Sequence, residues 1–323
     1  MKTMRAAWRE KYCAPDAVAV HTREIREPHA HEMRVRVMAT TVNRTDVAVL
    51  TGKPFIMRFF TGLMRPKLPI PGTDFAGTID AVGNEVTEFK IGDRVWGFDD
   101  QGLSSQAEYV ILSEKKNVLQ LSAKTSFADA AAGIEGAHYA CNFLNKVRLT
   151  AGQKVLVLGG TGAIGSALVQ FCKHYGLEVT ATAPTAHLEK VKALGADRVI
   201  DYQKEDFWTE KVRYNFVFDA VGKSTYGRCK RLLLPKGFYI SSELGPGGQN
   251  IFFALLRFFP FGPRVIFPVP SNIRRSLSFV AGLVAEGKFK PLIDRHYPIE
   301  KVAAAYTYVA SGQKIGNVIL DLE

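Results

Sequence analysis

The chain is short of cysteine, of long apolar runs and of acidic residues, and each shortage excludes a class of protein. Only four cysteines occur in 323 residues, and none forms a C-x-x-C pair, so we expect neither a disulfide framework nor a clustered zinc site. No stretch reaches the ~18 apolar residues that a membrane span requires, and the N-terminus has no apolar signal core. These features predict a cytoplasmic protein.

The charge balance is basic, with 42 Lys and Arg against 31 Asp and Glu, a formal net charge of +11. Such a balance suits anionic ligands, but no basic run is interleaved with stacking aromatics, so a nucleic acid is not an expected partner. The length and the 47% hydrophobic content predict two domains, each with its own core.

Residues 154–165, KVLVLGGTGAIG, are the most informative stretch, because four strand formers lead directly into Gly160-x-Gly162-x-x-Gly165. In a dinucleotide-binding turn the first glycine permits the tight turn, the second lets a pyrophosphate approach, and the third allows close helix packing. Thr161, Ala163 and Ile164 complete this expected phosphate site at a helix N-terminus. The alternative is a glycine-rich strand-to-helix turn that binds no ligand.

The pattern of elements changes along the chain. The first third predicts short strands with Pro and Gly turns, such as 33–41 and 77–82, in a barrel-like domain. From about residue 122, strands and helices alternate, which requires a parallel sheet. The strands are expected at 154–158, 178–182, 198–201, 215–220 and 238–242, and the helices at 163–175, 186–194, 226–234, 273–286 and 299–311. We expect residues 1–123 and 290–323 to form the first domain and 124–289 the nucleotide domain.

Several motifs carry a family resemblance over nearly the whole chain. They are Thr41-Val-Asn-Arg-Thr-Asp46, Pro71-Gly-Thr-Asp-Phe-Ala-Gly77, Val82-Gly-Asn-Glu-Val86, Gly92-Asp-Arg-Val-Trp-Gly97, the glycine turn, Leu194-Gly-Ala-Asp197 with Val199-Ile-Asp-Tyr202, and Phe218-Asp-Ala-Val-Gly222. With them the sequence resembles the medium-chain dehydrogenase/reductase superfamily, in its zinc-independent quinone oxidoreductase (zeta-crystallin-like) branch. The resemblance implies an α/β fold, with a GroES-like β-barrel domain plus a Rossmann doubly wound parallel sheet domain, and hydride transfer from a nicotinamide.

Within that superfamily, the zinc ligands of alcohol dehydrogenases are missing here. The chain has Asn43 in place of a Cys ligand, Thr73-Asp74 in place of a His-Glu pair, and Ile134 near the third position. Since zinc needs three or four converging Cys, His or carboxylate ligands, a lone Asp74 does not suffice. The lobe that carries a second, structural zinc in those relatives is reduced to residues 99–104, so no metal is expected.

Cofactor choice depends on the end of the second strand of the nucleotide domain. NAD enzymes place an acid about 20 residues beyond the glycine turn, where it binds the ribose hydroxyls. Here the strand ends in residues 182–187, TAPTAH, without an acid. Thr182, Thr185, His187 and Lys190 could donate to a 2′-phosphate, so NADPH is favoured over NADH. Alternatively, His187 and Lys190 are solvated residues that open a helix.

The resemblance implies further cofactor contacts. Tyr202 is expected at the adenosine phosphate end, Val221 and Gly222 on the adenine side, and Ser241 and Ser242 at the nicotinamide. Lys314 or Asn317 is expected to close over the cofactor.

Hydride transfer without a metal needs a hydrogen-bond donor for the substrate oxygen and a source of a proton. Asn43 is the first candidate donor, because it occupies the place of the metal-bearing Cys. The alternative is an Asn that holds a turn through its own backbone. His138, with Glu135 one helical turn earlier, is the second candidate, and a satisfied core histidine is the alternative.

Two apolar segments, residues 55–64 and 251–267, are too interrupted by Arg and Pro to span a bilayer. They could line an apolar substrate cleft, form a dimer edge, or rest peripherally on a membrane. Residues 264–267 correspond by resemblance to a strand that pairs across a two-fold axis, so we expect a homodimer.

The sequence thus predicts an NADPH-dependent, zinc-independent reductase of quinones or α,β-unsaturated carbonyls. One alternative is a zinc-free NADP-dependent alcohol or aldehyde dehydrogenase. Another is a protein of the same fold that senses NADPH or binds RNA without turnover.

Overall fold

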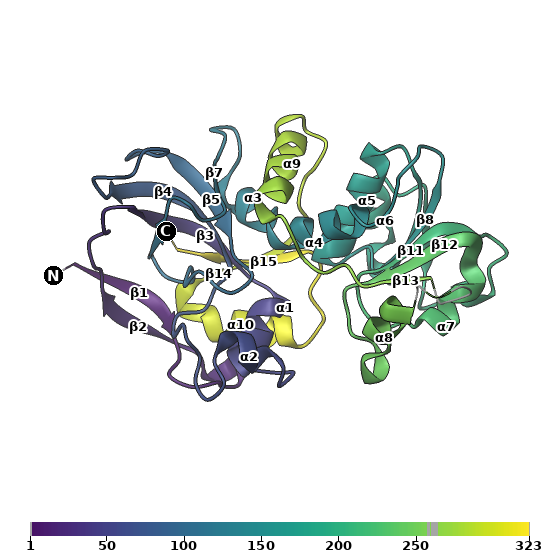
Figure 1. The fold of residues 1–323 in the computed structure, drawn as a ribbon, viewed down its shortest axis with the longest axis horizontal. Helices are drawn as coiled ribbons and strands as arrows, with labels where there is room; N and C mark the ends of the chain where they lie inside the picture. The colour runs from purple at the N-terminus through teal and green to yellow at the C-terminus, as the bar shows by residue number, and fades with distance from the viewer. Residues whose placement is uncertain (1, 257–258, 260–263, 323) are drawn as a thin grey trace. The chain divides into compact units, whose positions relative to one another are not determined.

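The computed structural model describes residues 2–256, 259 and 264–322, which form two compact units (Figure 1). Unit 1 comprises residues 1–135, 273–285 and 293–323, and unit 2 comprises 136–272 and 286–292. These bounds differ from the expected ones, because α3 (Phe127–Ala132) packs on strands of unit 1 and α9 (Ile273–Ala285) packs against β7 (Val118–Gln120). The fold class expected from the sequence is confirmed by the two sheets described next.

Unit 1 contains a seven-stranded sheet of order β14-β15-β3-β4-β5-β7, in which β6 also pairs with β3. Along β3, β6 pairs with residues 32–36 and β15 with residues 39–42, so two strands share one long partner. A separate hairpin consists of β1 and β2. The remaining bounds are β1 Thr3–Trp8, β2 Ala19–Glu24, β3 Glu32–Val42, β4 Asp74–Val82, β5 Arg94–Phe98, β6 Tyr109–Ser113, β14 Ile293–Pro298, β15 Asn317–Asp321, α1 Arg44–Thr51, α2 Met57–Thr61 and α10 Val302–Ala310.

The C-terminal segment completes this unit. β15 is hydrogen-bonded to β3, and α10 contributes Val302, Tyr306 and Val309 to the same buried core as Met33 and Phe75. Residues far apart in the sequence therefore form one apolar interior, and α1 packs directly against α10.

Unit 2 contains a six-stranded parallel sheet of order β10-β9-β8-β11-β12-β13, the strand order of the doubly wound dinucleotide-binding fold. Figure 1 shows α5 and α6 on one side of this sheet and α7 and α8 on the other. Strand order reverses between β8 and β11, the switch point at which such folds bind ligands. The bounds are α4 Glu135–Leu144, β8 Lys154–Leu158, α5 Ala163–His174, β9 Glu178–Ala183, α6 Leu188–Ala193, β10 Arg198–Asp201, β11 Tyr214–Asp219, α7 Tyr226–Cys229, β12 Leu233–Ser241, α8 Gln249–Leu256 and β13 Val265–Ile266.

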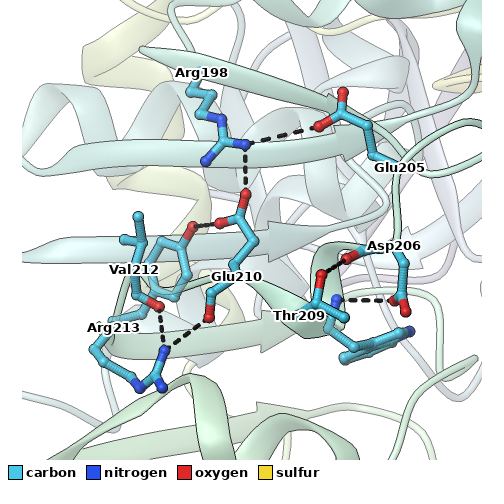
Figure 2. A network of polar contacts seen from close by, with 9 residues as sticks. Arg198, Glu205, Asp206, Thr209, Glu210, Val212 and Arg213 are labelled. Atoms are coloured by element: carbon cyan, nitrogen blue, oxygen red, sulfur yellow. Dashed lines mark hydrogen bonds and ion pairs between the residues drawn. The ribbon is translucent and has the colours of Figure 1, made fainter.

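The expected strands of this region are confirmed, and those at 154–158 and 198–201 have the expected bounds. The expected helix 226–234 is wrong in its extent, because α7 ends at Cys229, a 3-10 turn follows, and β12 already begins at Leu233. The connection between β10 and β11 has only a single 3-10 turn (Phe207–Thr209), and a polar network stabilises it (Figure 2). Arg198 on β10 pairs with Glu210 and, at 3.8 Å, with Glu205. Because the hydroxyl of Tyr214 on β11 also donates to Glu210 over 3.1 Å, this network joins the two strands through their connection.

The two apolar segments have different structures. Residues 55–64 include the short helix α2, whereas residues 249–256 form α8, which the sequence pattern did not predict. Phe258 and Phe261 of the second segment lie outside the described residues, as do Arg257 and Pro260. None of the described helices is long and apolar enough to cross a bilayer.

Candidate functional site

The glycine turn joins β8 to α5, as the sequence predicts, but the structural roles of its individual glycines differ from the expected ones. The tight turn depends on Gly159, which has φ +83°, rather than on Gly160. A Cβ on Gly160 would lie 3.0 Å from Val191 and 3.1 Å from Ala181, so this glycine permits close packing. At Gly165 a Cβ would lie 2.0 Å from the carbonyl oxygen of Gly159, which confirms the expected close approach of helix and strand.

The N-terminus of α5 is suited to bind an anion. Its N-cap is Gly162, which supplies no side-chain cap, and the first N–H groups of a helix have no acceptor within the helix. A Cβ on Gly162 would meet only the Gly159 oxygen, at 3.5 Å, so a ligand can approach the backbone there. The N–H groups of Ala163, Ile164 and Gly165 therefore fit a pyrophosphate.

The other expected cofactor residues of unit 2 lie at the carboxyl ends of neighbouring strands. Val221 and Gly222 follow β11, Ser241 ends β12 with Ser242 next to it, and Tyr202 follows β10 with its side chain half exposed. Because the carboxyl ends of parallel strands share one edge, the fold brings these residues to the same edge as the glycine turn. Lys314 and Asn317 belong to unit 1, where the Nζ of Lys314 donates to the carbonyl oxygen of Gly316 over 2.6 Å.

The end of β9 combines hydroxyl and imidazole groups with an acid that the sequence pattern did not place there. Thr182 is buried and accepts a hydrogen bond from the N–H of Gly159 at 3.0 Å. Thr185 is exposed, and its hydroxyl donates to Asp201 at the end of β10 over 2.5 Å. The half-buried His187 has no hydrogen-bond partner for its buried Nδ1 within the described residues. Because this nitrogen is buried, the imidazole would have to turn before it could meet a phosphate oxygen.

The edge does contain a carboxylate, since Asp201 lies beside Thr185. Asp201 belongs to the neighbouring strand β10, and β9 itself ends without an acid, as expected. Asp201 also accepts the N–H of Gln203 at 3.0 Å. These bonds commit one of its carboxylate oxygens to Thr185 and the other to Gln203.

In unit 1, Asn43 is the N-cap of α1. Its Oδ1 accepts from the N–H of Asp46 at 2.7 Å, and Asp46 in return accepts from the N–H of Asn43 at 3.0 Å, which completes a capping box. The Nδ2 of Asn43 donates to the hydroxyl oxygens of Thr73 at 3.0 Å and of Thr41 at 3.3 Å. Both amide hydrogens are thus used inside the protein.

Three carboxyl groups are buried near this cap. Burial raises the pKa of Asp74 to about 6 and that of Glu135 to about 7, and it raises the pKa of Asp46 well above its usual range. Their mutual repulsion acts in the same direction, because Asp74 raises the pKa of both Asp46 and Glu135. Among the described residues, no three His, Cys, Asp or Glu side chains are arranged to hold a metal ion.

Thr45 and Glu135 form the contact that sequence reasoning missed. The hydroxyl of Thr45, in the first turn of α1, donates to Oε1 of Glu135 over 2.6 Å. Glu135 is buried, whereas Thr45 is partly exposed. A carboxyl group with a pKa of about 7 that contacts a partly exposed hydroxyl can hold a proton and pass it outward. The two residues are 90 positions apart, so no local pattern indicated this pair.

His138 lies in unit 2 and is fully buried on α4. Its Nε2 is 3.2 Å from the Nδ2 of Asn142, which also donates to the His138 carbonyl oxygen at 2.9 Å. Burial lowers the pKa of His138 to about 4, so the imidazole is neutral at pH 7. A neutral imidazole is a weak proton donor at pH 7, and the catalytic role of His138 stays a prediction.

Comparison with known proteins agrees with this geometry. Residues 29–123 match the family described as alcohol dehydrogenase GroES-like domain, and residues 194–320 match the family described as zinc-binding dehydrogenase. The chain is 32% identical over 300 residues to 2-methylene-furan-3-one reductase of Solanum lycopersicum, covering 90% of this chain and 71% of that protein. It is 32% identical over 302 residues to the chloroplastic NADPH-dependent alkenal/one oxidoreductase of Arabidopsis thaliana, with coverages of 90% and 72%.

Among solved structures, the quinone oxidoreductase from Coxiella burnetii superposes with a TM-score of 0.88 at 26% identity, over 100% of both chains. The likeness therefore extends to both units and includes the glycine turn.

Proposed function

The chain belongs to the medium-chain dehydrogenase/reductase superfamily, in its quinone oxidoreductase-like group, and from this premise we propose that it reduces quinones or α,β-unsaturated carbonyls with NADPH. The superfamily membership implies an oxidoreductase with a nicotinamide cofactor. The observation that carries the proposal is the uncapped N-terminus of α5 at the carboxyl edge of the parallel sheet. Two relatives at 32% identity are named as reductases of conjugated carbonyl compounds.

NADPH is proposed over NADH because of the groups at the end of β9. Lys190 is exposed, and the half-buried His187 has no described partner for its Nδ1, which a turn of the ring would present to a ligand. Asp201 is engaged by Thr185 and Gln203, which reduces its capacity to bind ribose hydroxyls. A 2′-phosphate would therefore meet donors rather than a free carboxylate.

When bound, the cofactor supplies a hydride, and the protein must supply the proton that completes the reduction. We assign that proton to Glu135, acting through Thr45. When Glu135 is protonated, the carboxyl donates to the Thr45 oxygen over the 2.6 Å contact, in the reverse of the direction described above, and the Thr45 proton is free to point to the substrate. The Thr45 O–H bond then breaks as its proton reaches the substrate, and the Glu135 proton restores the hydroxyl. Asn43 holds the first turn of α1, on which Thr45 lies. The earlier hypothesis that Asn43 itself donates to the substrate requires its amide to release Thr41 or Thr73.

A homodimer and a cytoplasmic location remain part of the proposal. The candidate dimer strand, β13, ends the strand order of unit 2 and pairs with β12 through residues 239–240 and 265–266. No described strand pairs with its other edge, where we propose that a second copy binds, and sedimentation equilibrium would measure that association.

The test is a spectrophotometric screen of NADPH and NADH oxidation over quinones, conjugated enals and enones, and saturated aldehydes. We expect turnover with the first two classes and a preference for NADPH. Turnover of saturated aldehydes or alcohols alone would instead establish the alcohol or aldehyde dehydrogenase alternative. No turnover of any acceptor, together with tight NADPH binding, would refute the reductase and favour a sensor.

A further inference from the structure

An exposed apolar surface in unit 1 is unexplained by the reductase chemistry. It comprises Phe55, Ile56, Phe59, Phe60, Leu63 and Met64, on and around α2, and each of these side chains is between 52% and 84% exposed. With about 200 Å² for each ring, the three phenylalanines alone expose on the order of 400 Å². The whole surface exceeds the ~300–600 Å² of the largest patch on a typical monomer, which indicates an interaction site.

Polar contacts beneath α2 hold these side chains outward. The hydroxyl of Tyr12 lies 2.8 Å from the Oγ1 of Thr61 and donates to the carbonyl oxygen of Gly62. The Arg58 guanidinium lies 4.5 Å from the centre of the Tyr12 ring, and its Nε donates to the Gly52 carbonyl oxygen at 3.3 Å. Since the inner face of the segment is thus satisfied, its apolar residues cannot turn inward without breaking these bonds.

The charged residues within this segment of the sequence all have one sign. Between Asp46 and Asp74 the sequence has four basic residues and no acidic one. Three of them, Lys53, Arg65 and Lys67, are exposed. Aromatic and aliphatic side chains flanked by Lys and Arg are typical of segments that lie in the interface of an anionic bilayer.

We propose that residues 53–68 form a docking surface for an anionic lipid membrane, into which the exposed phenylalanines insert while Lys53, Arg65 and Lys67 contact the headgroups. A second copy of the chain fits less well, because a symmetric contact would bring two sets of these cations into one interface. A small neutral acceptor has no use for the three cations. This proposal goes beyond the proposed function and does not depend on it.

The test is co-sedimentation with vesicles of equal parts phosphatidylglycerol and phosphatidylcholine, compared with vesicles of phosphatidylcholine alone. We expect the wild-type protein to partition into the anionic vesicles and high salt to weaken this binding. The double variant Phe59→Ser/Phe60→Ser should reduce partitioning by about tenfold or more per ring. The variant Arg65→Ala/Lys67→Ala should reduce it by about fivefold per residue, for the anionic vesicles only.

A matched control is Phe252→Ser/Leu255→Ser on α8, since those side chains are 58% and 65% exposed but belong to unit 2. This control should bind vesicles as the wild type does, and thermal melting of every variant checks that it is folded. Absence of vesicle binding by the wild type overturns the proposal, as does unchanged binding by the Phe59→Ser/Phe60→Ser variant. If that variant instead dissociates a dimer or raises the acceptor KM without altering partitioning, the surface binds a second copy or the substrate, and the membrane proposal fails.

Discussion

Replacing Glu135 by Gln tests the proton source and has an effect on stability that can be derived from the structure. Burial raises the pKa of Glu135 from 4.5 to about 7, and Asp74 adds to this effect, whereas Thr45, Lys314 and Arg44 oppose it. Asp46 also interacts with this carboxyl group. Between pH 4.5 and about 7 the folded protein keeps the proton that the unfolded chain releases. The Glu135 contribution to the free energy of unfolding therefore falls as pH rises through this window and is lowest above pH 7.

The size of this effect follows from the two pKa values. The difference between 4.5 and about 7, at ~1.36 kcal/mol per pH unit, gives about 3 kcal/mol. Glutamine has nearly the same shape, can accept the Thr45 hydroxyl, and is never charged. The Glu135→Gln variant should therefore equal the wild type in stability near pH 4.5 and exceed it by up to about 3 kcal/mol at pH 8. For a unit of this size, that difference raises Tm by about 5–10 °C.

Two assays follow the same variant. Thermal melting from pH 4.5 to 8.5 measures the stability difference, and kcat over this range measures the catalytic role. If Glu135 is the proton source, wild-type kcat should decline above about pH 7, and Glu135→Gln should be slow at every pH. Thr45→Ser should retain the rate, whereas Thr45→Val should lose it. A stability difference independent of pH would refute the electrostatic argument, and an unchanged kcat profile would refute the catalytic one.

Four further predictions concern the cap, the cofactor site and the metal. Asn43→Ala should lower the free energy of unfolding by about 1–3 kcal/mol, because it removes a helix cap and leaves two buried hydroxyls without their donor. Its kcat should change only a few-fold, whereas a loss of ~100- to 1000-fold would establish Asn43 as an oxyanion donor. His187→Ala should weaken NADPH binding by about ten- to a hundredfold in calorimetric titration and leave NADH binding unchanged; equal wild-type affinities for the two cofactors would contradict this assignment. Thr182→Asp should shift the preference toward NADH. Activity should survive exhaustive chelation, and one tightly held zinc per chain in elemental analysis would overturn the metal prediction.

The parallel-sheet unit could be predicted from the sequence because each strand, turn and helix in it is indicated by consecutive residues. An apolar strand followed by a glycine turn and an amphipathic helix occupies about 20 consecutive residues, and Gly165 is required by a contact only six positions away. The sequence assigned the tight turn to Gly160, whereas the glycine with a positive φ is its neighbour Gly159. The pattern of three spaced glycines does not reveal which neighbour has a positive φ.

The site in unit 1 could not be predicted in the same way, since long-range contacts define it. Whether the Asn43 amide is free to donate depends on Thr73, 30 residues away, and the proton source depends on a bond between Thr45 and Glu135. Asp201 likewise reaches Thr185 from another strand. Each partner is an ordinary polar residue in its own segment, so only the folded arrangement distinguishes it.

The side chains at the positions of the zinc ligands are already engaged with one another. The carboxylate of Asp74 accepts from the backbone and hydroxyl of Thr41 and from the hydroxyl of Thr40, so both oxygens are occupied. Asn43 uses its amide hydrogens on Thr41 and Thr73. A cation there would have to displace buried hydrogen bonds, each of which costs free energy when left unmade. Thr45 is different, because its hydroxyl is partly exposed and contacts a carboxyl group with a pKa of about 7. If this pair is the proton source, as we propose, pH rather than metal content should control the rate.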